Sequence, residues 1–120
     1  MGKLSSYFKA LKATRRFGVA LKQDKKGETA RALRNARDGL RILSLPGVIR
    51  SNPAESSVLI QLTLLVESLT HESGESGASE KDLCDTYLSI TELEGTDVYS
   101  ELSEWLLYIE NKLGYVPSNN

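Results

Sequence analysis

Apolar side chains recur every three or four positions along most of the chain, which is the period of one face of an α-helix. This spacing predicts helices over residues 3–24, 28–45, 53–71, 79–94 and 97–113. No segment alternates apolar and polar residues as a half-buried strand does. The pattern therefore predicts an all-α fold, a single-domain bundle of about five amphipathic helices spanning residues 1–120.

The first predicted helix carries large apolar side chains at helical spacing. They are Leu4, Tyr7, Phe8, Leu11, Phe17 and Leu21. Because most of the steps between them are three or four residues, we expect them to share one face of an amphipathic helix. Lys25, Lys26 and Gly27 interrupt the pattern before the second helix begins.

The third predicted helix has the clearest start signal. Asn52 stands at the N-cap position, Pro53 at the first helical position and Glu55 at the third. Apolar residues then cover nearly the whole circumference as far as Leu69. A helix that is apolar on all sides is buried on all sides. We therefore expect this nearly all-apolar third helix to be the central element of the bundle.

Turn and cap signals separate the remaining elements. Residues 72–78 are rich in glycine and serine and are expected to form a mobile loop. Ser79 and Asp82 repeat the capping pattern at the start of the fourth helix, and Thr96 stands where it can cap the fifth. Gly114 is expected to end the fifth helix, with a frayed tail over 115–120.

Targeting signals are weak in this sequence. No apolar run approaches the roughly 18–20 residues that cross a bilayer, and no secretory signal pattern is present. Cys84 is the only cysteine, which excludes an intrachain disulfide. These features predict a soluble, cytoplasmic protein. Residues 1–6 also fit the permissive pattern for N-myristoylation at Gly2, to which an ordinary helix start is the alternative.

The side chains that usually carry catalysis or bind metals are scarce. His71 is the only histidine, and one histidine with one cysteine is too few for a structural zinc site. No phosphate-binding glycine loop or dinucleotide fingerprint occurs. We therefore predict no enzyme activity, no metal and no cofactor. An enzyme built around His71 is the least favoured hypothesis.

Charge is unevenly divided along the chain. Residues 1–50 hold 13 Lys and Arg against 3 Asp and Glu, and residues 51–120 hold 2 against 13. The formal net charge of -1 thus conceals a half of +10 and a half of -11. Three consequences are open. The halves neutralise each other within the bundle, or both stay exposed and attract charged partners or further copies, or the basic half binds phosphates.

Basic side chains are the main candidate binding residues. Four arginines of the second helix step by three or four and form a ridge: Arg31, Arg34, Arg37 and Arg41. Each guanidinium can bind two oxygens of a phosphate or carboxylate. The first helix carries a parallel basic set of Lys9, Lys12, Arg15 and Arg16. Tyr108, to one side of the apolar stripe of the last helix, is a candidate aromatic contact.

The favoured interpretation is a non-enzymatic helical domain of adaptor or inhibitor type that binds another protein. It rests on the missing catalytic and metal-binding patterns together with the two oppositely charged halves. Self-association into a homo-oligomer is one form that such binding can take. The alternative is recognition of phosphates, on nucleic acid or on an anionic membrane surface, by the two basic helices.

Overall fold

The computed structural model describes residues 2–75 and 77–114, with side chains from Leu4 onward. Its elements are α1 (Gly2–Lys25), α2 (Thr29–Leu43), α3 (Val48–Ser51), the 3-10 helix η1 (Pro53–Glu55), α4 (Ser56–Glu72), α5 (Glu80–Thr91) and α6 (Asp97–Leu113). No strand occurs among these residues, so the predicted all-α class is confirmed. The five longer helices match the five predicted ones, and α3 was not predicted. The tail 115–120 and Ser76 of the predicted loop lie outside the described residues.

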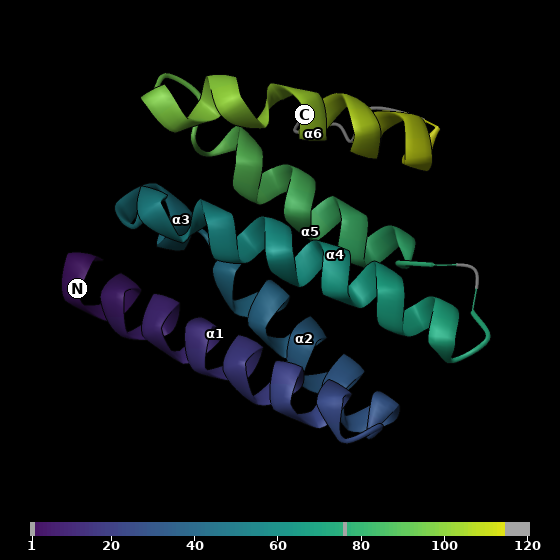
Figure 1. Ribbon diagram of the computed structural model, residues 1–120. Helices are drawn as coiled ribbons and strands as arrows, with labels where there is room; N and C mark the ends of the chain where they lie inside the picture. Colours follow the sequence, from purple (N-terminus) through teal and green to yellow (C-terminus); the bar gives the residue numbers. More distant parts are fainter. Residues whose placement is uncertain (1, 76, 115–120) are drawn as a thin grey trace.

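The long helices run back and forth across the molecule and form a layered array (Figure 1). Helix α1 packs mainly on α2, α2 packs on α4 and α5, and α6 packs on α5. Helices α1 and α6 therefore lie at opposite ends of the array (Figure 1). The principal extents of the molecule are 39 × 35 × 24 Å.

Helix α1 meets α2 through small side chains. Ala10, Ala13 and Ala20 are buried. A Cβ atom added to Gly39 of α2 would lie 3.3 Å from the carbonyl oxygen of Ala13 and 3.2 Å from Cδ1 of Leu62. Glycine and alanine thus permit the two helix backbones to approach closely, with α4 against the same point.

Most of the large apolar residues of α1 do not form the buried face that their spacing suggested, although Phe17 packs against the core. Leu4, Tyr7, Phe8 and Leu21 are exposed, and Phe8 keeps 57% of its surface accessible. The alanines occupy the side that faces α2, because the close approach of the helices leaves no room there for larger side chains. The expectation of a single apolar face is therefore wrong, and α1 carries apolar side chains on its solvent side.

The predicted start of the third helix is also corrected. Nδ2 of Asn52 donates to the carbonyl oxygen of Val48 at 2.8 Å, so its side chain serves the preceding turn and caps no helix. Pro53 opens η1, and α4 begins only at Ser56. Oε2 of Glu55 accepts a hydrogen bond from the Thr14 hydroxyl at 3.0 Å. A contact to α1 has therefore replaced the expected contact to the cap.

Burial on all sides of the third predicted helix is not observed. Leu59, Leu62, Val66 and Leu69 of α4 are fully buried, whereas Leu64 is 47% exposed. Helix α4 packs mainly on α2 and α5, and part of its surface, including Leu64, is left open to solvent. A helix that is apolar on all sides becomes buried on all sides only where enough neighbouring helices cover it.

The ends of the last two helices follow the sequence signals in part. The capping box of α5 is confirmed, because the Asp82 N–H donates to the Ser79 hydroxyl and the Ser79 N–H donates to the Asp82 carboxylate. Thr96 makes no such cap, since its hydroxyl donates to the Leu93 carbonyl oxygen at 2.6 Å. Gly114 ends α6 with a φ of 73°, as predicted.

Candidate functional site

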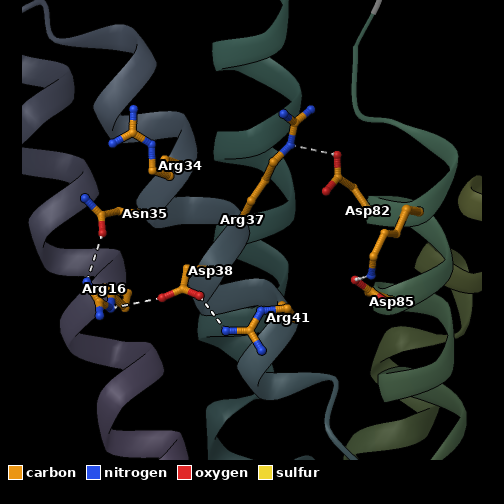
Figure 2. A pocket seen from close by; sticks show the side chains of 9 residues that line it. Arg16, Arg34, Asn35, Arg37, Asp38, Arg41, Asp82 and Asp85 are labelled. Atoms are coloured by element: carbon orange, nitrogen blue, oxygen red, sulfur yellow. Dashed lines mark hydrogen bonds and ion pairs between the residues drawn. The ribbon is translucent and has the colours of Figure 1, made fainter.

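A charged cleft of about 460 Å³ lies between α1, α2 and α5 (Figure 2). Arg16 comes from α1, and α5 supplies Lys81, Asp82 and Asp85. Helix α2 supplies the remaining lining residues, which are Arg34, Asn35, Arg37, Asp38 and Arg41. Five cationic and three anionic side chains thus line the cleft, which gives it a net charge of +2.

Helical spacing explains how α2 forms the floor of this cleft. Arg34, Arg37 and Arg41 follow one another at three and four residues, so they lie on one side of the helix. The opposite side of α2 carries buried apolar residues such as Leu40 and Leu43. On α5, Lys81 and Asp85 are one turn apart and form an ion pair of 3.2 Å at the cleft edge.

Arg37 connects the basic half of the chain to the acidic half. Its Nε lies 3.1 Å from Oδ2 of Asp82, toward which it points across the cleft (Figure 2), and a terminal nitrogen lies 3.7 Å from Glu75. The Asp82 side chain is only 9% exposed. Among the described residues, these two ion pairs alone join the halves. Mutual neutralisation of the halves through ion pairs is therefore confined to Arg37.

Asp38 holds two further arginines beside the cleft. Its Oδ2 lies 3.1 Å from Nε of Arg16, and its Oδ1 lies 2.6 Å from a terminal nitrogen of Arg41. Oδ1 of Asn35 also accepts a hydrogen bond from Arg16 at 3.3 Å. A guanidinium has five N–H donors, so each of these arginines keeps donors beyond those contacts. The carboxylate fixes the positions of the two guanidinium groups without saturating them.

Arg34 differs from the other arginines of the cleft. It is exposed and, within the described part of the chain, forms neither a hydrogen bond nor an ion pair. None of its five N–H donors is thus used by another described residue. Arg31 does not line the cleft; its side chain is 69% exposed and lies 3.6 Å from Glu28. The predicted ridge of four arginines is thus divided, with three members at the cleft.

The other basic residues predicted on the first helix lie on the solvent side of α1. Two adjoining hollows share Phe8 and Lys12; one also contains Lys9, and the other contains Arg15 and Val19. Lys9, Lys12 and Arg15 form no ion pair with a carboxylate among the described residues. Cationic and apolar side chains are thus mixed on this surface.

Tyr108 lies away from the cleft, on α6. Its ring meets that of Trp105 edge to face, with 5.8 Å between the ring centroids, and Nζ of Lys112 lies 5.6 Å from its centroid. The Tyr108 oxygen and then Glu67 raise the pKa of Lys112 above its ordinary value. The Lys112 ammonium therefore remains protonated beside Tyr108.

Sequence reasoning missed the contribution of α5 to the cleft. The capping pattern pointed to Asp82, but only as a helix-start residue, and nothing marked Lys81 or Asp85. His71 lies on the exposed end of α4, with Nε2 3.6 Å from Oε1 of Glu67. In residues 2–75 and 77–114, no three His, Cys, Asp or Glu side chains gather as a metal site requires.

The cleft and the solvent side of α1 are thus the two surfaces on which the candidate cations gather, and Tyr108 forms a third, aromatic surface. Over the part of the chain that the structure describes, every helix is too short or too polar to cross a membrane. No protein-family model matches this chain, and no curated protein or solved structure is significantly similar to it.

Proposed function

We propose that this protein is a non-enzymatic binding domain that takes an acidic segment of another protein into the cleft between α1, α2 and α5. The observation that carries this proposal is Arg34, an exposed arginine with no partner among residues 2–75 and 77–114, in a cleft of net positive charge. A carboxylate of the partner would accept two parallel hydrogen bonds from its guanidinium. The single cysteine suits a reducing compartment, and we place the protein in the cytoplasm.

Preorganisation of the neighbouring arginines favours such a ligand. Asp38 holds Arg16 and Arg41 in place, and Asp82 holds Arg37. Because these ion pairs already restrict the arginine side chains, less rotamer entropy is lost when their remaining donors meet a ligand. Arg34 would then provide the main new ion pair, and the ordered arginines would supply further donors around it.

The carboxylates of the cleft favour a peptide over a polyanion. Asp38 and Asp85 lie among the cations, and they repel a ligand that carries a negative charge at every position. A protein segment can combine acidic side chains with neutral or basic ones and so satisfy both signs. Nucleic acid cannot vary its backbone charge in this way.

Phosphate recognition is the second candidate, and Lys9, Lys12 and Arg15 favour it. These three cations have no carboxylate partner among the described residues. An anionic membrane or a nucleic acid would bind them through its phosphates, with an affinity that falls steeply as salt rises. This candidate requires no contribution from the α5 side of the cleft.

A matched pair of charge reversals tests the proposal. Arg34→Glu alters the cleft, and Arg31→Glu makes the same change one turn earlier on α2, outside the cleft. Binding is measured by fluorescence anisotropy against a library of labelled peptides with dispersed Asp and Glu residues. Arg34→Glu should weaken the best peptide at least about tenfold, equivalent to roughly 1.4 kcal/mol. Arg31→Glu should change its affinity less than about twofold, as expected for an exposed charge.

Two outcomes would contradict the proposal. In one, Arg34→Glu and Arg31→Glu weaken peptide binding equally, which would indicate general electrostatic attraction. In the other, no peptide binds, while duplex DNA, single-stranded RNA or phosphatidylserine vesicles bind with steep salt dependence. That second result would support phosphate recognition, and Lys12→Glu should then be the more damaging substitution.

A further inference from the structure

Two hollowed surfaces outside the cleft carry exposed apolar side chains; one lies on α1 at one end of the array, and the other lies between α4 and α6, which is the helix at the opposite end (Figure 1). The first, which we name the α1 outer face, consists of Leu4, Phe8, Lys12, Arg15 and Val19. The second, which we name the α4–α6 groove, is a hollow of about 390 Å³ lined by Leu64, Glu104, Trp105 and Tyr108. Each surface combines apolar side chains with charge of one sign.

The α1 outer face has the pattern of a helix that docks into a groove. Leu4, Phe8, Arg15 and Val19 differ by multiples of about one helical turn, so they form a stripe along α1. They lie on the side of the helix opposite the buried Ala10, Ala13 and Ala20. Helix-in-groove recognition uses apolar anchors about one turn apart, as Leu4 and Phe8 are, and Val19 extends the stripe further along α1.

The α4–α6 groove offers the matching features. Leu64 and Tyr108 are exposed, and the half-buried Trp105 lies between them and the core. Aromatic residues of this kind form the centres of many interfaces, because they bury a large area with few rotatable bonds. The groove is a preformed apolar hollow of a size that takes one or two large side chains, such as Phe8.

The opposite charges of α1 and α6 favour a second copy of this chain over a membrane as the partner of these surfaces. Residues 2–25 contain seven Lys and Arg against one Asp, whereas residues 97–113 contain four Asp and Glu against one Lys. Lys12 and Arg15 form no ion pair among the described residues, and the same holds for Glu101 and Glu104. A membrane would account for the cations of α1 and leave the acidic α6 unexplained. Contact between two copies accounts for both.

We infer that copies of this chain associate head to tail, with the α1 outer face of one copy in the α4–α6 groove of the next. The two contacting surfaces are different, so the interface is heterologous, and it extends into open chains or closes into a ring. This inference does not depend on the proposed function, because neither surface contains Arg34 or Arg37. The variants below also leave unchanged Arg16, which lines both the cleft and the hollow beside Arg15.

Complementary variants test this geometry. Phe8→Asp with Val19→Asp disables the α1 outer face and leaves the groove intact. Leu64→Gln with Tyr108→Gln disables the groove and leaves α1 intact. Leu88→Asp replaces an exposed apolar residue of α5 outside both surfaces and serves as the matched control. Circular dichroism checks that every variant keeps its helices.

Analytical ultracentrifugation from about 10 μM to 1 mM measures the mass of each variant in solution. The wild-type protein and Leu88→Asp should gain mass with concentration, with dissociation constants within about twofold of each other. Each double variant alone should associate at least about tenfold more weakly. An equimolar mixture of the two double variants should form a 1:1 dimer and nothing larger, because it contains one intact face and one intact groove.

Three results would overturn the inference. The wild-type protein could keep its monomer mass up to 1 mM, or the mixed variants could fail to form a dimer. The third is a monomeric wild type that sediments with phosphatidylserine vesicles and loses this property on Phe8→Asp with Val19→Asp. A membrane, and not a second copy, would then occupy the α1 outer face.

Discussion

Replacing Arg37 by Met tests how strongly the two oppositely charged halves are joined. Methionine keeps most of the apolar stem of arginine and removes the guanidinium. The lost contacts are the 3.1 Å bond from Nε to Asp82, a carboxylate that is only 9% exposed, and the 3.7 Å ion pair with the exposed Glu75. Asp82 keeps two other donors, the Ser79 N–H at 3.0 Å and the Ser79 hydroxyl at 2.8 Å. The substitution therefore does not leave the buried carboxylate without partners.

The loss of unfolding free energy expected for Arg37→Met lies between two limits. Breaking a fully buried ion pair costs about 3–5 kcal/mol, and an exposed pair contributes about 0–1 kcal/mol. The Arg37 side chain is 35% exposed, and Asp82 retains its Ser79 contacts. A hydrogen bond to a charged group contributes roughly 1.5–3 kcal/mol. We expect Arg37→Met to lower the free energy of unfolding by about 1.5 kcal/mol, at the lower end of that range.

Urea denaturation of a double-mutant cycle measures this value. The cycle uses Arg37→Met, Asp82→Asn and the double variant, and the coupling free energy should be about 1 kcal/mol. Arg41→Met is the matched control, because its partner Asp38 lies on the same helix and is more exposed than Asp82. The control should cost about 0.5 kcal/mol or less.

A cost for Arg37→Met no larger than that of Arg41→Met would refute this reasoning. A coupling free energy near zero would do the same. Either result would mean that the Arg37–Asp82 pair behaves as a solvated surface pair. The docking of the basic half on the acidic half would then depend on apolar packing and on the remaining hydrogen bonds between the halves, such as that from Thr14 to Glu55.

Three smaller predictions concern single side chains, and urea titration measures each. Ser79→Ala removes the hydroxyl that caps α5 and should lower the free energy of unfolding by about 1 kcal/mol. Gly18→Ala should raise it by about 0.5–1 kcal/mol, because Gly18 lies inside α1 and an added Cβ meets nothing within 4 Å; a decrease would contradict that packing. Burial and the hydrogen bond to Glu110 raise the pKa of Tyr87, so folding favours the protonated phenol. This contribution is complete below the ordinary phenol pKa of about 10 and is lost as pH rises above it, so the wild-type protein should lose stability there more steeply than Tyr87→Phe.

Local sequence signals were sufficient to predict the helical class and most element ends. The apolar period of three to four residues located the five long helices, because it reflects the geometry of a single helix. Ser79 with Asp82 and the glycine at 114 marked ends correctly, since each acts through atoms within a few residues. Asn52 gave the clearest start signal and failed, because its side chain donates to the Val48 carbonyl oxygen and the Glu55 carboxylate accepts from Thr14.

The candidate site could be predicted only in part. The spacing of three or four residues between successive arginines placed Arg34, Arg37 and Arg41 on one side of a helix, and that placement is correct. The other wall of the cleft comes from α5, about 45 residues later, and no pattern in the sequence records which helix lies across from α2. The partners of Arg37 were therefore not predictable.

Periodicity by itself determined which residues of this protein share a helix face, and the tertiary structure decided which face is buried. On α1, the alanines at 10, 13 and 20 are buried and Phe8 is exposed, although phenylalanine is the more apolar residue. The physical reason is the close approach of α2 at Gly39, where only small side chains fit. Burial depends on the shape of the neighbouring helix as well as on hydrophobicity, and that neighbour is set by the packing of the whole chain.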